Sequence, residues 1–389
     1  MSKPPEGVIW EAPEHTLAKI AILRAYLQAW FTILGKTVPR DMLYIDGFAG
    51  PGSYAGDRDG SPIVAVKAAH AAHGFAGKDW RAKTIRMVFV ESDKQRFETL
   101  RMQLAACRKD SSIAIQCMNG EFASAFNDIK RLHQDAFTSS MPIFAFLDPF
   151  GVKGIPFRIV RDILASKTSE AFLLLDTDGM ERIRSAGKSA GHEKILNNVF
   201  GGEKWRDLAY TDDAKSNGQK LLAAYRQQLR DDAGAEFTFP FEMRNANGTI
   251  SHHLLFATKH LKGLEKMKGA MRSINKNFIF TDGQSGQDFL FGPDDPAVIR
   301  RDAEIYFNDR FKGCQLSYNE IASWILQETP YMSAERILDE ISRRGGVELH
   351  GVAGKTANRA RRAVPWREIG TITFRERLVP PETGLFDQE

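Results

Sequence analysis

Five short apolar runs alternate with helix-like segments between residues 42 and 179, and this alternation constrains the fold more than any other feature. The runs are MLYIDGF (42–48), TIRMVFVESD (84–93), SIAIQCMNGEF (112–122), PIFAFLDPFG (142–151) and EAFLLLDTDG (170–179). Strands of a buried parallel sheet have nearly continuous apolar sequences, and consecutive parallel strands need a helical crossover between them. The pattern therefore predicts an α/β fold in which helices cover both faces of a parallel sheet.

A second strand pattern follows the parallel set. FTFPFEMRN (237–245) and SHHLLFATKH (251–260) lie on either side of an Ala-Asn-Gly turn, which predicts an antiparallel hairpin. With this hairpin the mixed sheet has seven strands. Polar helical sequence over about 180–234 is expected to form an insertion before it. An amphipathic helix is predicted over 14–35, with its last residue, Gly35, suited to the C-cap.

The chain has 389 residues, which predicts at least two domains. We expect the sheet domain to occupy 1–291 and GPDDPA (292–297) to serve as a linker. Three helical patterns, a strand, a basic loop and a second strand then follow over 297–379, and this order is typical of a winged-helix domain. The last residues, 380–389, are predicted to form a mobile tail.

Composition narrows the class of protein. Hydrophobic residues make up 43% and charged residues 26%, as in ordinary globular domains, and we find no apolar run near the roughly 18 residues of a membrane span. The N-terminus has no apolar segment of the kind found in secretory signals. Three cysteines without a C-x-x-C pair favour a reducing compartment and argue against structural zinc. We therefore expect a cytoplasmic protein without a metal.

Polar residues and glycines follow four of the predicted parallel strands, where open α/β sheets bind their ligands. The candidates are Asp46, Gly47, Phe48, Gly50 and Gly52 after the first strand, Glu91 after the second, Asn119, Glu121 and Phe122 after the third, and Asp148, Pro149 and Phe150 after the fourth. Glycines let the backbone approach a ligand, and an acid can accept both hydroxyls of a ribose. Each feature alone has a structural alternative, a tight turn or a helix N-cap. Their succession favours a nucleotide-like ligand.

The first loop differs from two common nucleotide motifs. It is neither GxGxxG nor GxxxxGK[ST], and Glu91 follows Asp46 at a longer interval than the roughly 20 residues typical of dinucleotide enzymes. These differences argue against NAD and against a phosphate-binding P-loop.

The strand-end motifs resemble those of the class I S-adenosylmethionine-dependent methyltransferases over about residues 40–280. The resemblance implies a Rossmann-like fold and S-adenosylmethionine as cofactor. It also implies that the loop from Asp46 to Gly52 holds the methionine part, that Glu91 holds the ribose, and that Asn119, Glu121 and Phe122 bind the adenine.

A narrower resemblance rests on five stretches. HTLAKIAILRAYLQAW, YIDGFAGPGSY, GSPIVA, FLDPFG and LLFATKH resemble the three-Cys-motif partner (TcmP) proteins, a bacterial family of methyltransferase-like proteins. This resemblance implies a protein partner that carries a three-cysteine motif.

The expected reaction is inferred from the DPFG stretch. LDPFGVKGIPF (147–157) is similar to a stretch of the tRNA guanine-N2 dimethyltransferases, in which the motif serves an exocyclic amine. The similarity implies that Asp148 accepts a hydrogen bond from the amine and that Phe150 stacks on the base. Base-amino methyltransferases commonly have (D/N)-P-P-(Y/F), and here the second proline is missing. The alternative is that Asp148 caps the next helix and Phe150 packs in the core.

Other polar side chains are expected near the same edge. Asp176 and Asp178 end the fifth predicted strand, where contact with substrate is favoured over metal binding. His15 and Lys19 lie one helical turn apart and could line the mouth of the cofactor site. The adjacent histidines at 252–253 are expected to be structural.

The C-terminal region is basic. Between residues 343 and 377 there are nine Lys and Arg residues and three acids, an excess above the +4 of the whole chain. The candidate nucleic-acid contacts are Arg343, Arg344, Lys355, Arg359, Arg361, Arg362, Trp366 and Arg367. Such a cluster favours phosphate contacts, with Trp366 stacking on a base. The alternatives are a solvated basic loop and a docking site for an acidic protein.

Together these observations predict an S-adenosylmethionine-dependent methyltransferase acting on an exocyclic amine of a base in RNA or DNA. Two alternatives remain open. The chain could be a non-catalytic, cofactor-binding partner or regulator of a three-cysteine-motif protein, or it could methylate a small molecule or a protein.

Overall fold

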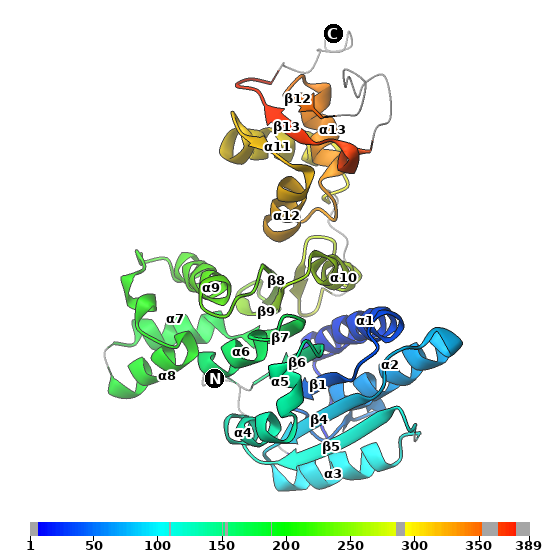
Figure 1. Ribbon diagram of the computed structural model, residues 1–389. Helices are drawn as coiled ribbons and strands as arrows, with labels where there is room; N and C mark the ends of the chain where they lie inside the picture. The colour runs from blue at the N-terminus through cyan, green and yellow to red at the C-terminus, as the bar shows by residue number, and fades with distance from the viewer. Residues whose placement is uncertain are drawn as a thin grey trace. The chain divides into compact units, whose positions relative to one another are not determined.

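The computed structural model describes residues 7–108, 110–149, 151, 155–187, 189–284, 292–351 and 365–378. The chain forms two compact units, Met1–Gln287 and Asp288–Glu389 (Figure 1). Several predicted features lie outside the described residues. These are Phe150, Lys355, Arg359, Arg361, Arg362 and the segment 380–389.

The first unit contains an eight-stranded sheet in the order β10-β8-β9-β7-β6-β1-β4-β5 (Figure 1). Its strands are β1 (Met42–Asp46), β4 (Ile85–Glu91), β5 (Ile113–Asn119), β6 (Ile143–Leu147), β7 (Ser169–Leu175), β8 (Phe237–Arg244), β9 (Ile250–Thr258) and β10 (Ile279–Thr281). The first five are mutually parallel, and the β8–β9 hairpin joins β7 in antiparallel pairing. The predicted α/β class and mixed sheet are confirmed, with β10 as an additional strand parallel to β8. A small hairpin, β2 (Ser53–Tyr54) with β3 (Arg58–Asp59), lies in the first loop.

Helices cover both faces of this sheet. They are α1 (Glu14–Thr37), α2 (Ser61–Ala76), α3 (Lys94–Ala105), α4 (Phe122–Leu132), α5 (Gln134–Thr138), α6 (Phe157–Leu164), α7 (Thr177–Ser185), α8 (Ala190–Phe200), α9 (Ala214–Asp231) and α10 (Leu261–Arg272). Successive side chains of a strand point to opposite faces. Leu43 and Ile45 of β1 accordingly share a core with α4–α9. Tyr44 stacks on Phe144, which in turn contacts Tyr26 of α1 on the other face.

Helix α1 continues past the predicted end at Gly35. A side chain at Gly35 would collide with the ring of Trp80, so this glycine provides space for packing and does not end the helix. Among the described residues, α1 is the one helix long and apolar enough to span a membrane. It packs against α2 and α10 with its apolar side chains buried, as core helices do. The cytoplasmic location stays a prediction.

The helical insertion begins earlier than the sequence pattern suggests. Strand β7 ends at Leu175, and the Asp176 carboxylate accepts a hydrogen bond from the backbone amide of Gly179 at 2.8 Å, which caps α7. Asp176 and Asp178 therefore do not lie on a strand. Helices α7, α8 and α9 pack on one another and on the α6 side of the sheet.

Residues that follow strand β10, near the end of the first unit, contact the start of helix α1. Asp282, directly after β10, lies with Oδ2 3.3 Å from Nδ1 of His15. The backbone amide of Gly283 donates to Oε2 of Glu14 at 2.7 Å. The start of α1 and the end of the sheet thus meet at one place.

The second unit combines helices with a three-stranded antiparallel sheet in the order β11-β13-β12. Its elements are α11 (Pro296–Tyr306), a π-helical turn (Phe307–Phe311), β11 (Gln315–Leu316), α12 (Tyr318–Glu328), α13 (Glu335–Arg343), β12 (Val347–His350), a 3₁₀ turn (Trp366–Glu368) and β13 (Thr371–Phe374). The winged-helix assignment itself stays a prediction.

Trp366 belongs to the core of the second unit, so its predicted stacking on a base is wrong. Its side chain is 0% exposed and packs in the cluster that contains Phe311 and Ile341. The indole Nε1 donates to Oδ1 of Asp339 at 2.9 Å. The ring therefore has no face available to a nucleotide.

Replacing Trp366 with Phe should destabilise the second unit by about 1–3 kcal/mol, because a buried hydrogen bond and one ring are lost. Chemical denaturation of the full chain measures this effect, with the exposed Glu348→Gln as a control expected to change stability by less than about 0.5 kcal/mol. Wild-type stability in Trp366→Phe would contradict a core role, since Phe retains an aromatic face but not the indole contact.

Candidate functional site

A first cavity of about 320 Å³ lies at the carboxyl ends of β1, β4 and β5. Five of the predicted cofactor residues line it: Gly47, Phe48, Glu91, Glu121 and Phe122. Arg96 of α3 and Gly120 also line it. Side chains that follow three different strands thus meet around one space, as the parallel sheet predicts.

Glu91 is held by the backbone around this cavity. Its Oε2 accepts from the Gly50 amide at 2.8 Å and its Oε1 accepts from the Asp93 amide at 2.7 Å. Burial raises the pKa of Glu91, and these two hydrogen bonds oppose the increase. A carboxylate can accept about four hydrogen bonds, so this fixed group retains capacity for a ligand's hydroxyls.

The glycines of the site have two different roles. Gly50 and Gly120 have positive φ values of 63° and 152°, and a side chain at either would meet no atom within 4 Å, so both border open space. A Cβ at Gly47 would lie 2.8 Å from the side chain of Leu147, and Gly52, at φ 89°, faces α3 at 3.2 Å. The last two glycines are therefore explained by packing.

Besides Gly50 and Gly52, two predicted cofactor residues, Asn119 and Asp46, do not line the cavity. Asn119 donates from Nδ2 to the carbonyl oxygen of Glu91 at 2.8 Å and so links the ends of β4 and β5. Asp46 is completely buried, and its Oδ1 accepts from the Phe48 amide at 3.2 Å. Their direct contact with a cofactor stays a prediction.

Asp46 lies between the acids that mark the two halves of the site. Burial raises the pKa of Asp46 to about 7, against the hydrogen bonds of Ser61 and Phe48, and the negative charges of Asp148 and Glu91 add to the increase. A protonated carboxyl at this position avoids placing a third negative charge among them.

Asp46→Asn should make stability less dependent on pH. The unfolded carboxyl ionises near pH 4 and the folded one near pH 7, so the wild type should lose up to about 1.4 kcal/mol per pH unit relative to the variant as the pH rises between these values. Urea unfolding at several pH values measures the difference. The exposed Asp128→Asn should show no such trend, and a flat difference for Asp46→Asn would refute the assignment.

A second cavity of about 460 Å³ lies at the carboxyl ends of β6 and β7. Asp148 and Pro149 of the DPFG motif line it, together with His15 and Lys19 from the start of α1. The structure therefore brings these two regions of the sequence together, although they are more than 100 residues apart.

Asp148 forms an ion pair with Lys19, and both residues line this cavity. Lys19 Nζ donates to its Oδ2 at 2.6 Å, and the Lys19 residue is only 7% exposed. Pro156 is the N-cap of α6 and no side chain caps that helix, so Asp148 does not serve as the helix cap considered from the sequence. A nearly buried cation instead fixes its carboxylate beside the cavity.

The remaining polar groups of the second cavity are mostly paired. Asp176 caps α7, and Asp178 forms an ion pair with Arg182 at 3.1 Å. Within the described parts of the chain, no group of three or more His, Cys, Asp or Glu residues is arranged to hold a metal ion.

The two adjacent histidines of β9 have different environments. His253 is 2% exposed and lies 3.0 Å from the hydroxyl of Thr177, which agrees with the expected structural role. His252 borders the second cavity, and burial lowers its pKa well below the usual range, so its ring is neutral. Its Nδ1 lies 2.9 Å from the Ser251 hydroxyl. Sequence reasoning did not identify His252 as a cavity residue.

Trp10 connects the two cavities. It lines the second cavity, and the guanidinium of Arg96, which lines the first, lies 4.7 Å from its ring centre. Tyr54 of the glycine-rich loop contacts the Trp10 ring edge-on at 5.4 Å. The cavities therefore adjoin along the sheet edge. No motif around Trp10 indicated this contact in advance.

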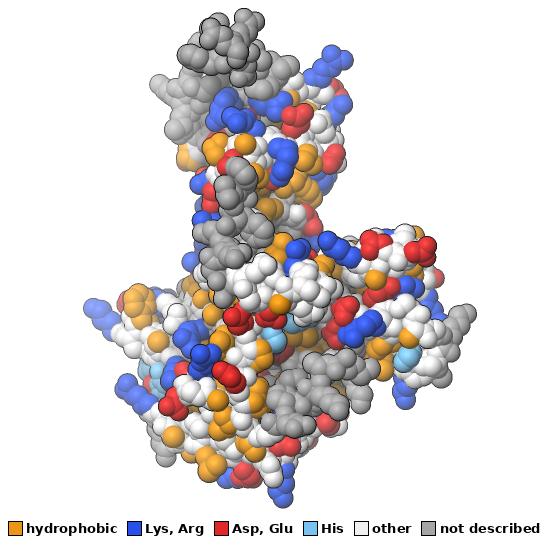
Figure 2. All heavy atoms as spheres, turned by 180° about the vertical axis from the view of Figure 1, so that it is seen from behind, with side chains coloured by type: hydrophobic (Ala, Val, Ile, Leu, Met, Phe, Trp, Pro, Cys, Tyr) orange, Lys and Arg blue, Asp and Glu red, His pale blue; other side chains and the backbone are white. Residues whose placement is uncertain are grey.

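The described basic residues of the second unit lie among acids. Arg343 pairs with Glu340, and Arg344 pairs with Glu304 at 3.1 Å. Arg367 is exposed. Lys and Arg side chains stand next to Asp and Glu side chains over this unit in Figure 2. Nucleic-acid contact by Arg343, Arg344 and Arg367 stays a prediction.

No family model and no curated protein matches the chain. The O-methyltransferase from Bacillus cereus in complex with SAH aligns at 11% identity over 64% of this chain and 92% of its own, with a TM-score of 0.31. Cofactor-bound Rv0187 from MTB aligns at 13% identity over 64% and 91%, with a TM-score of 0.31. A DUF574 family protein from Streptomyces avermitilis aligns at 12% identity over 61% and 83%, with a TM-score of 0.28. At these scores the fold assignment rests on the strand order itself, and the TcmP and DPFG resemblances stay predictions.

Proposed function

We propose that the chain is an S-adenosylmethionine-dependent methyltransferase whose acceptor is an exocyclic amine of a nucleic-acid base. The observation that carries this proposal is the pair of adjoining cavities at the carboxyl edge of the sheet. One contains the backbone-anchored Glu91, and the other contains Asp148.

The residues of the first cavity fit the adenosine part of this cofactor. Ribose hydroxyls need fixed acceptors, which Glu91 supplies, and Glu121 could accept from the adenine amino group. The rings of Phe48 and Phe122, 5.5 Å apart, offer an aromatic wall. When bound, S-adenosylmethionine supplies a methyl group activated by its sulfonium.

Asp148 is suited to hold an acceptor amine. Its carboxylate would accept a hydrogen bond from the NH₂ group, orient the nitrogen lone pair and stabilise positive charge as it develops there. In the free protein Lys19 occupies one of its oxygens, and the amine would replace or join that donor. Phe150, outside the described residues, would stack on the base, and Arg343 and Arg367 would contact phosphates.

Incubation of the full chain with isotopically labelled cofactor and with total tRNA, rRNA or DNA tests this proposal. We expect label in one of the three, on an exocyclic nitrogen. Absence of label from all three, with cofactor binding verified by calorimetry, would overturn it.

The Lys19–Asp148 ion pair also favours a second hypothesis, a non-catalytic partner of a three-cysteine-motif protein, because the acid already has a buried counter-ion. In that case no acceptor would be labelled, and Asp148→Ala would still co-purify with the three-cysteine protein. A catalyst would instead lose turnover in this variant.

A further inference from the structure

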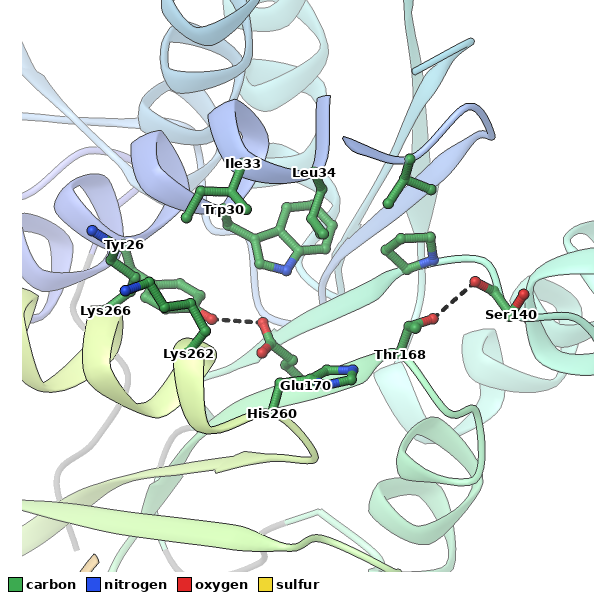
Figure 3. A pocket seen from close by; sticks show the side chains of 13 residues that line it. Tyr26, Trp30, Ile33, Leu34, Ser140, Thr168, Glu170, His260, Lys262 and Lys266 are labelled. Carbon is green, nitrogen blue, oxygen red and sulfur yellow. Dashed lines mark hydrogen bonds between the residues drawn. The ribbon is translucent and has the colours of Figure 1, made fainter. Parts of the chain in front are cut away.

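A third cavity of about 270 Å³ lies at the opposite edge of the sheet, beside the residues that precede or begin β6 and β7. Figure 3 shows it between α1 and the start of α10. None of its lining residues lines either of the cavities described above. It is therefore separate from the proposed methyl-transfer site.

The wall of this cavity is largely apolar. Trp30 and Leu34 of α1 border it in Figure 3, and Val38 and Pro142 add aliphatic surface. A cavity of about 150 Å³ accommodates benzene in another protein, so the space here has room for a body of two fused rings. An aromatic face and branched aliphatic groups are suited to a planar ring system.

One acid, Glu170, lines this apolar space. The residue is 4% exposed. The Tyr26 hydroxyl donates to its Oε2 at 2.6 Å, and the Thr258 hydroxyl donates to its Oε1 at 2.7 Å. Since a carboxylate can accept about four hydrogen bonds, Glu170 retains acceptor capacity.

The charge of Glu170 is only partly compensated. Burial raises the pKa of Glu170, and the hydrogen bonds from Tyr26 and Thr258, the charge of His260 and a hydrogen bond from Trp30 oppose this increase only in part. The first turn of α10 lies against it, since a side chain at Gly263 would collide with Oε1. A helix N-terminus carries roughly half a positive charge, whereas a buried carboxylate needs a full counter-charge or several donors.

Two lysines at the rim do not supply that charge. Lys262 and Lys266 lie on the exposed side of α10, and Lys262 pairs with Glu265 at 2.8 Å. Water and salt screen exposed charges over about 10 Å, whereas Glu170 is enclosed. A cationic group inside the cavity would therefore stabilise the charged form of Glu170.

We propose that this third cavity binds a compact aromatic amine, whose ammonium group donates to Glu170 and whose ring lies against Trp30 and Leu34. This inference is independent of the proposed methyl transfer. It assigns a second ligand, at the other edge of the sheet, to the same unit.

Three indole compounds that differ in charge test the assignment on the full chain by calorimetry. Tryptamine carries an ammonium group, indole is neutral and indole-3-acetate carries a carboxylate. We expect tryptamine to bind at least tenfold more tightly than either of the others. Equal binding of all three, or tighter binding of indole-3-acetate, would overturn the proposal.

Two variants then locate the binding. Glu170→Gln should weaken tryptamine binding at least tenfold, and Leu34→Trp should abolish it by filling the space. Glu98→Gln is the matched control, because this exposed acid of α3 lies outside the cavity, and it should bind as the wild type does. If the first two variants fail to fold, the wild type still decides, because tryptamine should shift the NMR signal of the Trp30 indole N–H. Binding that leaves this signal unmoved, or that survives both variants, would refute the site.

Discussion

Replacing Asp148 with Asn is expected to lower the turnover number of methyl transfer roughly 10²–10³-fold while cofactor affinity stays close to that of the wild type. Asn keeps the shape of the side chain but removes the negative charge that would stabilise the amine nitrogen as it becomes positive. Loss of one preorganised electrostatic group at a reaction centre typically has an effect of this size. Asp148 lines the second cavity and not the first, so cofactor binding should be spared. Single-turnover transfer and calorimetry measure the two quantities.

Two further variants sharpen this result. Asp162→Asn removes an acid that pairs with Lys130 outside both cavities and should leave turnover unchanged. Lys19→Met removes the cation from Asp148 and should raise KM more than it lowers kcat, because the carboxylate loses its fixed position. Wild-type turnover in Asp148→Asn, or an equal loss of cofactor binding, would contradict a role in holding the acceptor.

Glu91→Ala is expected to weaken binding of S-adenosylmethionine roughly 100-fold or more. Two hydrogen bonds between a carboxylate and ribose hydroxyls contribute about 1.5–3 kcal/mol each, and the Gly50 and Asp93 amides also lose their acceptor. Glu91→Gln keeps one carbonyl oxygen and should cause a smaller loss, roughly tenfold. Calorimetric titration with the cofactor measures both.

The control for this series is Glu98→Ala. Glu98 is an exposed acid of α3 that pairs with Arg101, so its loss alters net charge but not the first cavity. If Glu98→Ala weakens binding as much as Glu91→Ala, or if Glu91→Ala binds normally, the ribose assignment is wrong.

The sheet was predictable because its signal is local. Each of the five parallel strands is a short apolar run, buried in β1, β4, β6 and β7 and half-exposed in the edge strand β5, and the hairpin has its own turn. Where the observed ends of helices and strands differ from the predicted ones, the difference arises from contacts that the local sequence pattern does not show. A glycine such as Gly35 is typical of a helix end, yet α1 continues to Thr37. The glycine is needed there for packing, because the ring of Trp80 occupies the space that a side chain would fill. Asp176 continues an apolar run in sequence, but its carboxylate caps α7. Strand β10 has only three residues, too few to give a pattern.

The candidate site was predictable to the same degree. Strand ends locate Glu91 and Asp148, because topology alone places the ends of parallel strands along one edge. Pairings between distant parts of the chain were not predictable. Lys19 was expected near the site, but its ion pair with Asp148, 129 residues later, was not. Trp366 was misassigned because a cluster of charge says nothing about where an indole within it packs. The buried Glu170 gave no indication either, since the residues that contact it come from α1, β9 and α10, all distant from it in sequence.

The contact between Glu14 and Gly283 has a consequence for how the first unit could be rearranged. Because the start of α1 and the end of β10 are hydrogen-bonded, a short peptide could join them and the backbone could be opened at an exposed loop instead. Such a circular permutant would keep every strand pairing of the sheet. For the same reason we expect the unit to tolerate insertion into a surface loop of another protein, since its two ends would leave and re-enter the host at one place.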